Sequence, residues 1–116
     1  MQYLLLLHSE EAGWSQMTPE EQAQGMAAYS AFTQALKDAG ALVASARLSP
    51  SSGAKTVQTK GGKSVTMDGP FAETKEQVAG FYLIEAPDMA AASRWAEQCP
   101  GSGHGAVEVR ALWPTG

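Results

Sequence analysis

The sequence has little of what several common classes of protein require. It contains one cysteine, Cys99, among 116 residues. No disulfide can therefore form within the chain, which is typical of proteins from a reducing compartment. Eight basic residues are outnumbered by twelve acidic ones, giving a formal net charge of −4. Nucleic acid is excluded as an expected partner, because neutralising its phosphates needs a basic face on the protein.

Long hydrophobic runs are also missing. No segment approaches the roughly 18 consecutive apolar residues of a membrane-spanning helix. The leucines at 4–7 follow no basic region and lead directly into His8, Ser9 and Glu10, so they do not fit a signal peptide. We expect a soluble, cytoplasmic protein with no membrane partner.

Motifs for well-known chemistry are absent as well. The chain has no Gly-rich phosphate loop before a helix, no Gly-x-Ser-x-Gly and no Cys-x-x-Cys. His8, His104 and Asp68 are residue types that can bind zinc or another divalent ion. However, His104 lies 36 positions after Asp68, and these residues do not show the short spacing that is typical of metal ligands. We predict neither a metal site nor a cofactor.

The residues that are present predict a single α+β domain over 1–116, since 44% are hydrophobic. Strand patterns occupy 2–8, 41–48, 78–85 and 106–112. A hairpin is predicted where 56–59 and 64–67 flank a Gly-Gly turn. With one helix before the second strand and one before the last, the order is β-α-β, hairpin, β-α-β. This is the split βαβ, ferredoxin-like plan, in which the first strand lies antiparallel between the third and the fourth.

Capping residues in the sequence predict where the two helices begin and where the first one ends. Thr18 and Glu21 form a capping box around Pro19, and Gly40 is a typical helix end. Asp88 is predicted to cap the second helix. The inner stripes are expected at Met26, Tyr29, Phe32, Leu36 and Ala39 in the first helix, and at Ala92, Trp95, Ala96 and Cys99 in the second.

The strand pattern predicts a homodimer. Tyr3, Leu5 and Leu7 alternate with Leu4, Leu6 and His8 in the first strand, and Phe81 and Leu83 alternate with Tyr82 and Ile84 in the third. Both faces are apolar, but two helices cover only one face. Each large apolar side chain left exposed costs about 1.5–3 kcal/mol, so a second copy is the simplest cover. The alternative is that the 50–77 insertion folds back over this face.

A site is expected at one end of the sheet. His8 ends the first strand, His104 precedes the last, and the polar segment 68–76 runs into the third. We predict a small-molecule site with acid/base chemistry by Asp68 and His104. Further ligand contacts are expected from His8, Phe71, Glu73 and Lys75, with Lys75 holding an anionic group.

Each of these residues also has a structural explanation. Asp-Gly-Pro is turn chemistry, lone histidines often cap strands, and Glu73 and Lys75 fit a solvated surface. Glu108 and Arg110 share one face of the last strand and are expected to form an ion pair, within the chain or across the dimer. Cys99 is expected to be an inert core thiol, and Trp14 and Trp95 to be packing residues.

The string Asp-Gly-Pro-Phe-Ala-Glu-Thr-Lys-Glu at 68–76, followed by Gly-Phe-Tyr at 80–82, resembles the hallmark of the DGPF branch of YCII-related proteins. Met1–Leu7, the Pro-Glu-Glu at 19–21, Ala-Tyr at 28–29, Ala-Phe at 31–32 and Val-Glu-Val-Arg at 107–110 are similar to other family positions. The resemblance covers essentially the whole chain. It implies the dimeric α+β barrel variant of the ferredoxin-like fold.

The resemblance leaves function open. YCII-related proteins are suspected enzymes because many carry a His on the first helix and an Asp before a proline after the second. Those positions fall here at Tyr29 and Cys99, so Tyr29 is expected to contact the ligand while the His/Asp pair itself is missing. DGPF proteins also resemble partners or neighbours of extracytoplasmic-function sigma factors. The alternative function is therefore a non-catalytic regulatory or interaction module.

Overall fold

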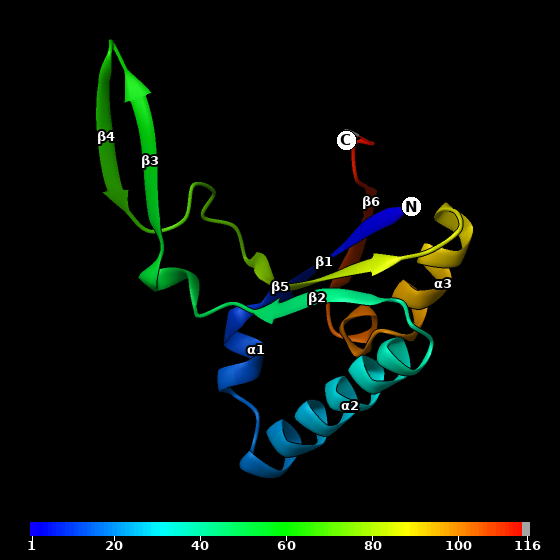
Figure 1. Ribbon diagram of the computed structural model, residues 1–116. Helices are drawn as coiled ribbons and strands as arrows, with labels where there is room; N and C mark the ends of the chain where they lie inside the picture. Colours follow the sequence, from blue (N-terminus) through cyan, green and yellow to red (C-terminus); the bar gives the residue numbers. More distant parts are fainter. Residues whose placement is uncertain (115–116) are drawn as a thin grey trace.

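The computed structural model describes residues 1–114 and has the predicted ferredoxin-like α+β architecture (Figure 1). The main sheet has the strand order β2-β5-β1-β6, and each pair of neighbouring strands is antiparallel. Its strands are β1 (Gln2–Glu10), β2 (Leu42–Arg47), β5 (Glu76–Glu85) and β6 (Ala106–Ala111). The helices are α1 (Glu11–Ser15), α2 (Pro19–Asp38) and α3 (Met89–Gln98), with short 3₁₀ turns η1 (Ser51–Gly53) and η2 (Pro100–Gly103). Within residues 1–114, no helix combines the length and apolar character needed to cross a membrane.

The helix ends are confirmed. The Thr18 hydroxyl accepts from the Glu21 amide at 3.1 Å, and the Glu21 carboxylate accepts from the Thr18 amide at 3.0 Å. These bonds lower the pKa of Glu21. Gly40 follows α2 with φ of 68°, the left-handed conformation that glycine adopts without strain. The Asp88 carboxylate accepts from the Ala91 amide at the start of α3.

The core lies between the main sheet and helices α2 and α3. Tyr3, Leu5 and Leu7 of β1 and Tyr82 and Ile84 of β5 are buried there, against Phe32, Leu36, Ala92, Ala96 and Cys99. Phe32 meets Tyr82 edge-on, with ring centroids 5.1 Å apart. Of the predicted stripe of α2, only Phe32 and Leu36 are buried, and Ala39 at its C-terminal end is exposed. Met26 is 44% exposed and Tyr29 is half-buried, so the expectation of a fully buried stripe is corrected.

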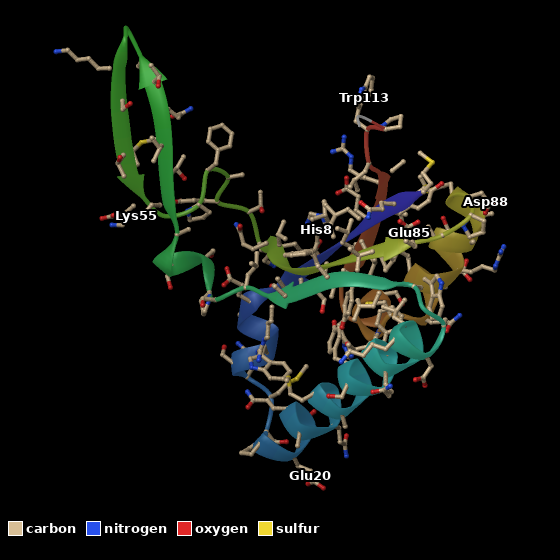
Figure 2. The ribbon with its side chains drawn as sticks, in the orientation of Figure 1. His8, Glu20, Lys55, Glu85, Asp88 and Trp113 are labelled. Carbon is tan, nitrogen blue, oxygen red and sulfur yellow. The ribbon has the colours of Figure 1, made fainter. Side chains whose placement is uncertain are left out.

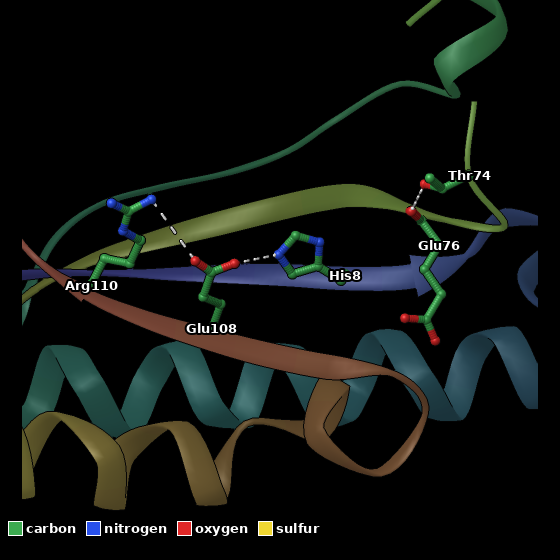
Figure 3. Close-up of polar contacts among 5 residues, drawn as sticks. All are labelled: His8, Thr74, Glu76, Glu108 and Arg110. Atoms are coloured by element: carbon green, nitrogen blue, oxygen red, sulfur yellow. Dashed lines mark hydrogen bonds and ion pairs between the residues drawn. The ribbon is translucent and has the colours of Figure 1, made fainter. Parts of the chain in front are cut away.

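On the opposite face of the main sheet, no helix of residues 1–114 covers the strands (Figure 3). We call it the open face. It presents Leu4 and Leu6 from β1 and Phe81 and Leu83 from β5, all partly exposed. His8, Glu108 and Arg110 lie on the same side. The isolated chain therefore leaves an apolar sheet surface in contact with water.

The predicted hairpin is β3 (Lys55–Lys60) with β4 (Lys63–Asp68), joined by Gly61 and Gly62 with φ of 58° and 79°. This hairpin projects from the body as an arm (Figure 1). The alternative that the insertion folds over the open face is thus wrong for the single chain. The Cα radius of gyration is 16.1 Å, against roughly 13 Å for a compact domain of this length.

Candidate functional site

A cleft of about 620 Å³ lies between α2 and the strands β2 and β5, on the helix-covered side of the sheet. It exists because α2 is anchored by Phe32 and Leu36 near its C-terminus. The part of α2 before Phe32 presents Met26, Tyr29 and Ser30 to the gap and supplies no buried apolar residue. The helix runs obliquely away from β2 toward α1 (Figure 1).

One wall of the cleft is the indole of Trp14 in α1, a helix that the sequence pattern did not predict. Gly25 of α2 allows close packing, since a Cβ there would lie 3.3 Å from the Trp14 ring. The Gln22 side-chain amide donates to the Trp14 carbonyl at 2.9 Å. On the other side, the Arg47 guanidinium lies 4.6 Å from the ring centroid, a favourable cation–π distance.

The floor of the cleft is a row of hydroxyl groups. Thr33 donates its hydroxyl proton to the Tyr29 carbonyl at 2.9 Å, and its oxygen lies 2.9 Å from the Tyr82 hydroxyl. Because a threonine hydroxyl has one proton, Tyr82 is the donor in the second bond. These two hydrogen bonds hold the Tyr82 ring between the core and the cleft.

Tyr29 is the titratable group most affected by this environment. Burial raises its pKa to about 12, with further contributions from Cys99 and Tyr82, while Arg47 acts in the opposite direction. Burial also raises the pKa of the Cys99 thiol, which is 1% exposed. Both groups therefore keep their protons at neutral pH. Tyr29 can donate a hydrogen bond to a ligand, whereas Cys99 is the inert core thiol that was expected.

A smaller hollow of about 420 Å³ continues from the cleft past Trp14 and Arg47, toward Leu48 and Pro50. Among the described residues that line this hollow, the acidic one is Glu11. The Glu11 carboxylate accepts from the Ser51 amide at 2.8 Å and from the Ser51 hydroxyl. These two bonds lower the pKa of Glu11. They also tie α1 to the η1 turn at the base of the arm.

The predicted convergence at one end of the main sheet is found for part of the set. His8 pairs with Ala106 across β1 and β6, so His104 lies just beyond that pair. Lys75 Nζ is 3.8 Å from Glu10 Oε1 at the same end. His8 Nε2 is 3.0 Å from Glu108 Oε1, and Arg110 Nη1 is 4.0 Å from Glu108 Oε2 (Figure 3). The expected Glu108–Arg110 pair therefore exists and includes His8.

Other predicted site residues lie elsewhere. Asp68 ends β4 and forms an exposed ion pair with Lys55 on the arm. Figure 2 shows Lys55 well separated from His8. Phe71 is 78% exposed and Glu73 is also exposed, in the segment between arm and sheet. The structure thus brings Asp68 to neither histidine, and of the predicted residues only Tyr29 lines the cleft.

Metal-ligating side chains are scattered. Within residues 1–114, no group of three or more His, Cys, Asp or Glu side chains is placed to hold an ion. The cleft residues missed from the sequence are chiefly Trp14, Thr33 and Arg47. One signal was present: Tyr29, Ser30 and Thr33 place hydroxyl groups along the sheet-facing side of α2, where a packed helix would carry apolar residues.

Comparison with known proteins adds the family. Residues 1–115 match the YCII-related domain. The chain belongs to the YCII-related family. An uncharacterised protein of Rhizobium meliloti (strain 1021) is 38% identical over 114 residues, which is 97% of this chain and 92% of that protein.

The family membership draws attention to two positions of this YCII-related domain. The resemblance placed a His/Asp pair of the family at Tyr29 and Cys99. These residues lie near each other in the fold: Cys99 raises the pKa of Tyr29, and a Cβ on Gly101, two residues after Cys99, would lie 2.8 Å from the Tyr29 hydroxyl. The two positions therefore meet in space, although a phenol and a buried thiol occupy them here.

Replacing Tyr29 by Phe tests the burial of this phenol. Its folded pKa of about 12 lies above the ordinary value of 10.0. Its stabilising contribution is therefore complete below pH 10 and is lost as the pH rises from 10 to 12. We expect the free energy of unfolding of Tyr29→Phe to fall less steeply over this range than that of the wild type. Denaturant titrations at several alkaline pH values measure both slopes, and identical slopes would contradict the assignment.

Proposed function

We propose that this YCII-related protein is a homodimer that binds a small molecule in the cleft between α2 and the main sheet. The observation that carries the proposal is the cleft itself. Its volume of about 620 Å³ lies within the range of ligand pockets, roughly 300–1,000 Å³. Its apolar wall and its convergent hydroxyl groups have the composition of such pockets.

Binding is the role that the cleft chemistry favours over nucleophilic catalysis. Tyr29 and Cys99 both hold their protons near neutral pH, because burial raises both pKa values. Neither is a base or a nucleophile under those conditions. Tyr29 is a hydrogen-bond donor to the ligand in this proposal. An acid/base role for Asp68 and His104 stays a prediction, and it requires the arm of one chain to reach the sheet end of another.

The open face supports the homodimer. It exposes Leu4, Leu6, Phe81 and Leu83 on the two central strands, and burying them supplies the driving force for association. The same face carries a negatively and a positively charged residue on β6, Glu108 and Arg110. A surface with both charges can pair with its own copy across a two-fold axis.

The arm supports the same assembly. A two-stranded hairpin alone is marginally stable in water. The arm nevertheless exposes Val57, Val65 and Met67 at 62%, 38% and 39%. The polar contacts of the arm, such as the bond from the Thr56 hydroxyl to the Gly69 carbonyl, join residues of the arm to its own base. A second copy offers a surface on which these side chains can pack.

Two finer assignments accompany this proposal. We place the chain in the DGPF branch because of the nine-residue string at 68–76. We place it in the cytoplasm because its single cysteine is a buried, free thiol, as is usual in a reducing compartment.

Filling the cleft tests the binding proposal. Ser30→Trp puts an indole into the gap, whereas Ala31→Trp puts the same group on an exposed position of α2 outside the lining. A fragment library is screened against the wild type by ligand-observed NMR, and the hits are repeated on both variants. We expect Ser30→Trp to lose the hits and Ala31→Trp to keep them. Hits that survive in a folded Ser30→Trp would place binding outside the cleft.

Charge substitutions on β1 test the dimer. Leu6 lies on the open face and Leu5 is 0% exposed in the core. Wild-type protein should sediment as a dimer of 12.2 kDa chains at micromolar concentration. Leu6→Glu should sediment as a monomer, because each interface would bury an unpaired carboxylate. Leu5→Glu should unfold the chain, at a cost of several kcal/mol. A well-folded wild-type monomer would contradict the proposal.

A further inference from the structure

The charge of the cleft has one sign. The charged residues among its described lining are Lys37 and Arg47, and no carboxylate lines it. This contrasts with the chain as a whole, whose formal net charge is −4. A recess that carries only cations on an acidic protein concentrates anions.

Arg47 has donors available for a ligand. Its described contacts are with the Trp14 ring at 4.6 Å and, through Nη1, with the Met26 sulfur at 3.7 Å. Both partners are neutral, and among the described residues no carboxylate lies within ion-pair distance of Arg47. The contact with Trp14 holds the guanidinium beside the indole, and the Arg47 donors other than the one bonded to Met26 remain available for an acid group. Arginine binds carboxylates and phosphates with its planar fork of N–H donors.

The carboxylate of the adjoining hollow does not neutralise this position. Glu11 lies in the adjoining hollow, where its carboxylate accepts hydrogen bonds from the amide and the hydroxyl of Ser51. It is held by the base of the arm and does not pair with Arg47. The positive charge of Arg47 therefore faces the cleft.

The remainder of the lining sets the other end of the ligand. Trp14 and Met26 supply an apolar surface, and Tyr29 and Ser30 supply hydroxyl groups. Resting on the proposed cleft function, we infer that the ligand is a compact organic anion, with one carboxylate or phosphate bound by Arg47 and an apolar body against Trp14.

Three small probes separate charge from shape. Benzoate and phenyl phosphate carry an acid group on a ring, and benzamide is the neutral match of benzoate. Binding is followed by the indole N–H signals of ¹⁵N-labelled protein. Trp14 reports on the cleft, while Trp95 in the core and Trp113, 84% exposed near the C-terminus, are internal controls. We expect the acids to shift the Trp14 signal at concentrations at which benzamide does not. Whichever of the two acids binds more tightly identifies the bound group as a carboxylate or a phosphate.

The Arg47→Gln variant should weaken binding of the acids by about tenfold or more, as expected for loss of a charge-assisted hydrogen bond. Arg94→Gln removes the same charge from an exposed position outside the lining and should leave affinity unchanged. Arg47→Lys keeps the charge without the fork and should fall between. An unshifted Trp95 signal verifies that each variant is folded.

Equal shifts by benzoate and benzamide, with no effect of Arg47→Gln, would overturn the anion inference while leaving the cleft function intact. Failure of both acids to shift Trp14 would overturn it too. The cleft function itself is judged separately by whether Ser30→Trp abolishes the hits of the fragment screen.

Discussion

The architecture depends on β1, which is hydrogen-bonded on both edges and apolar on both faces. It pairs with β5 along one edge and with β6 along the other. Its odd-numbered side chains from Tyr3 to Leu7 are buried under α2 and α3, and its even-numbered ones face away from the helices. Since successive strand residues point to opposite faces, shifting β1 by one residue would exchange the two sets and expose the core. The helix layer and the unprotected open face both follow from this strand.

The cleft follows from the way in which one helix completes the layer. Phe32 and Leu36 anchor α2 at its C-terminal end, and from there the helix diverges from β2. Full packing would require large apolar residues where α2 instead has Ser30 and Thr33. The space that remains is bounded by Trp14, which Gly25 and Arg47 hold in place. The well-packed part of the fold thus positions the proposed site, and the gap that α2 leaves beside β2 forms its cleft.

Much of the fold could be predicted from local patterns. The Thr18–Glu21 capping box, the Gly40 helix end and the Gly61–Gly62 turn each encode their geometry within a few residues, and all are present. Helix α1 escaped prediction because five residues carry too little periodicity. The cleft could not be predicted from local patterns, because Trp14 and Arg47 are far apart in the sequence and meet only in the folded chain. His8 and His104 lie at one end of the sheet, as the predicted strand order implies. The position of Asp68 could not be predicted in this way, because the projecting arm takes it away from the histidines.

We place the proposed ligand site of this YCII-related protein in the cleft beneath β2, and not at the histidine end of the sheet. A map of backbone amide shifts during titration with a mixture of acidic and neutral metabolites distinguishes the two places. The strongest shifts should cluster on the cleft side of α2, at residues 26–37, and on β2 at 45–47. Shifts concentrated at 68–76, His8 and His104, with the cleft unaffected, would contradict this placement.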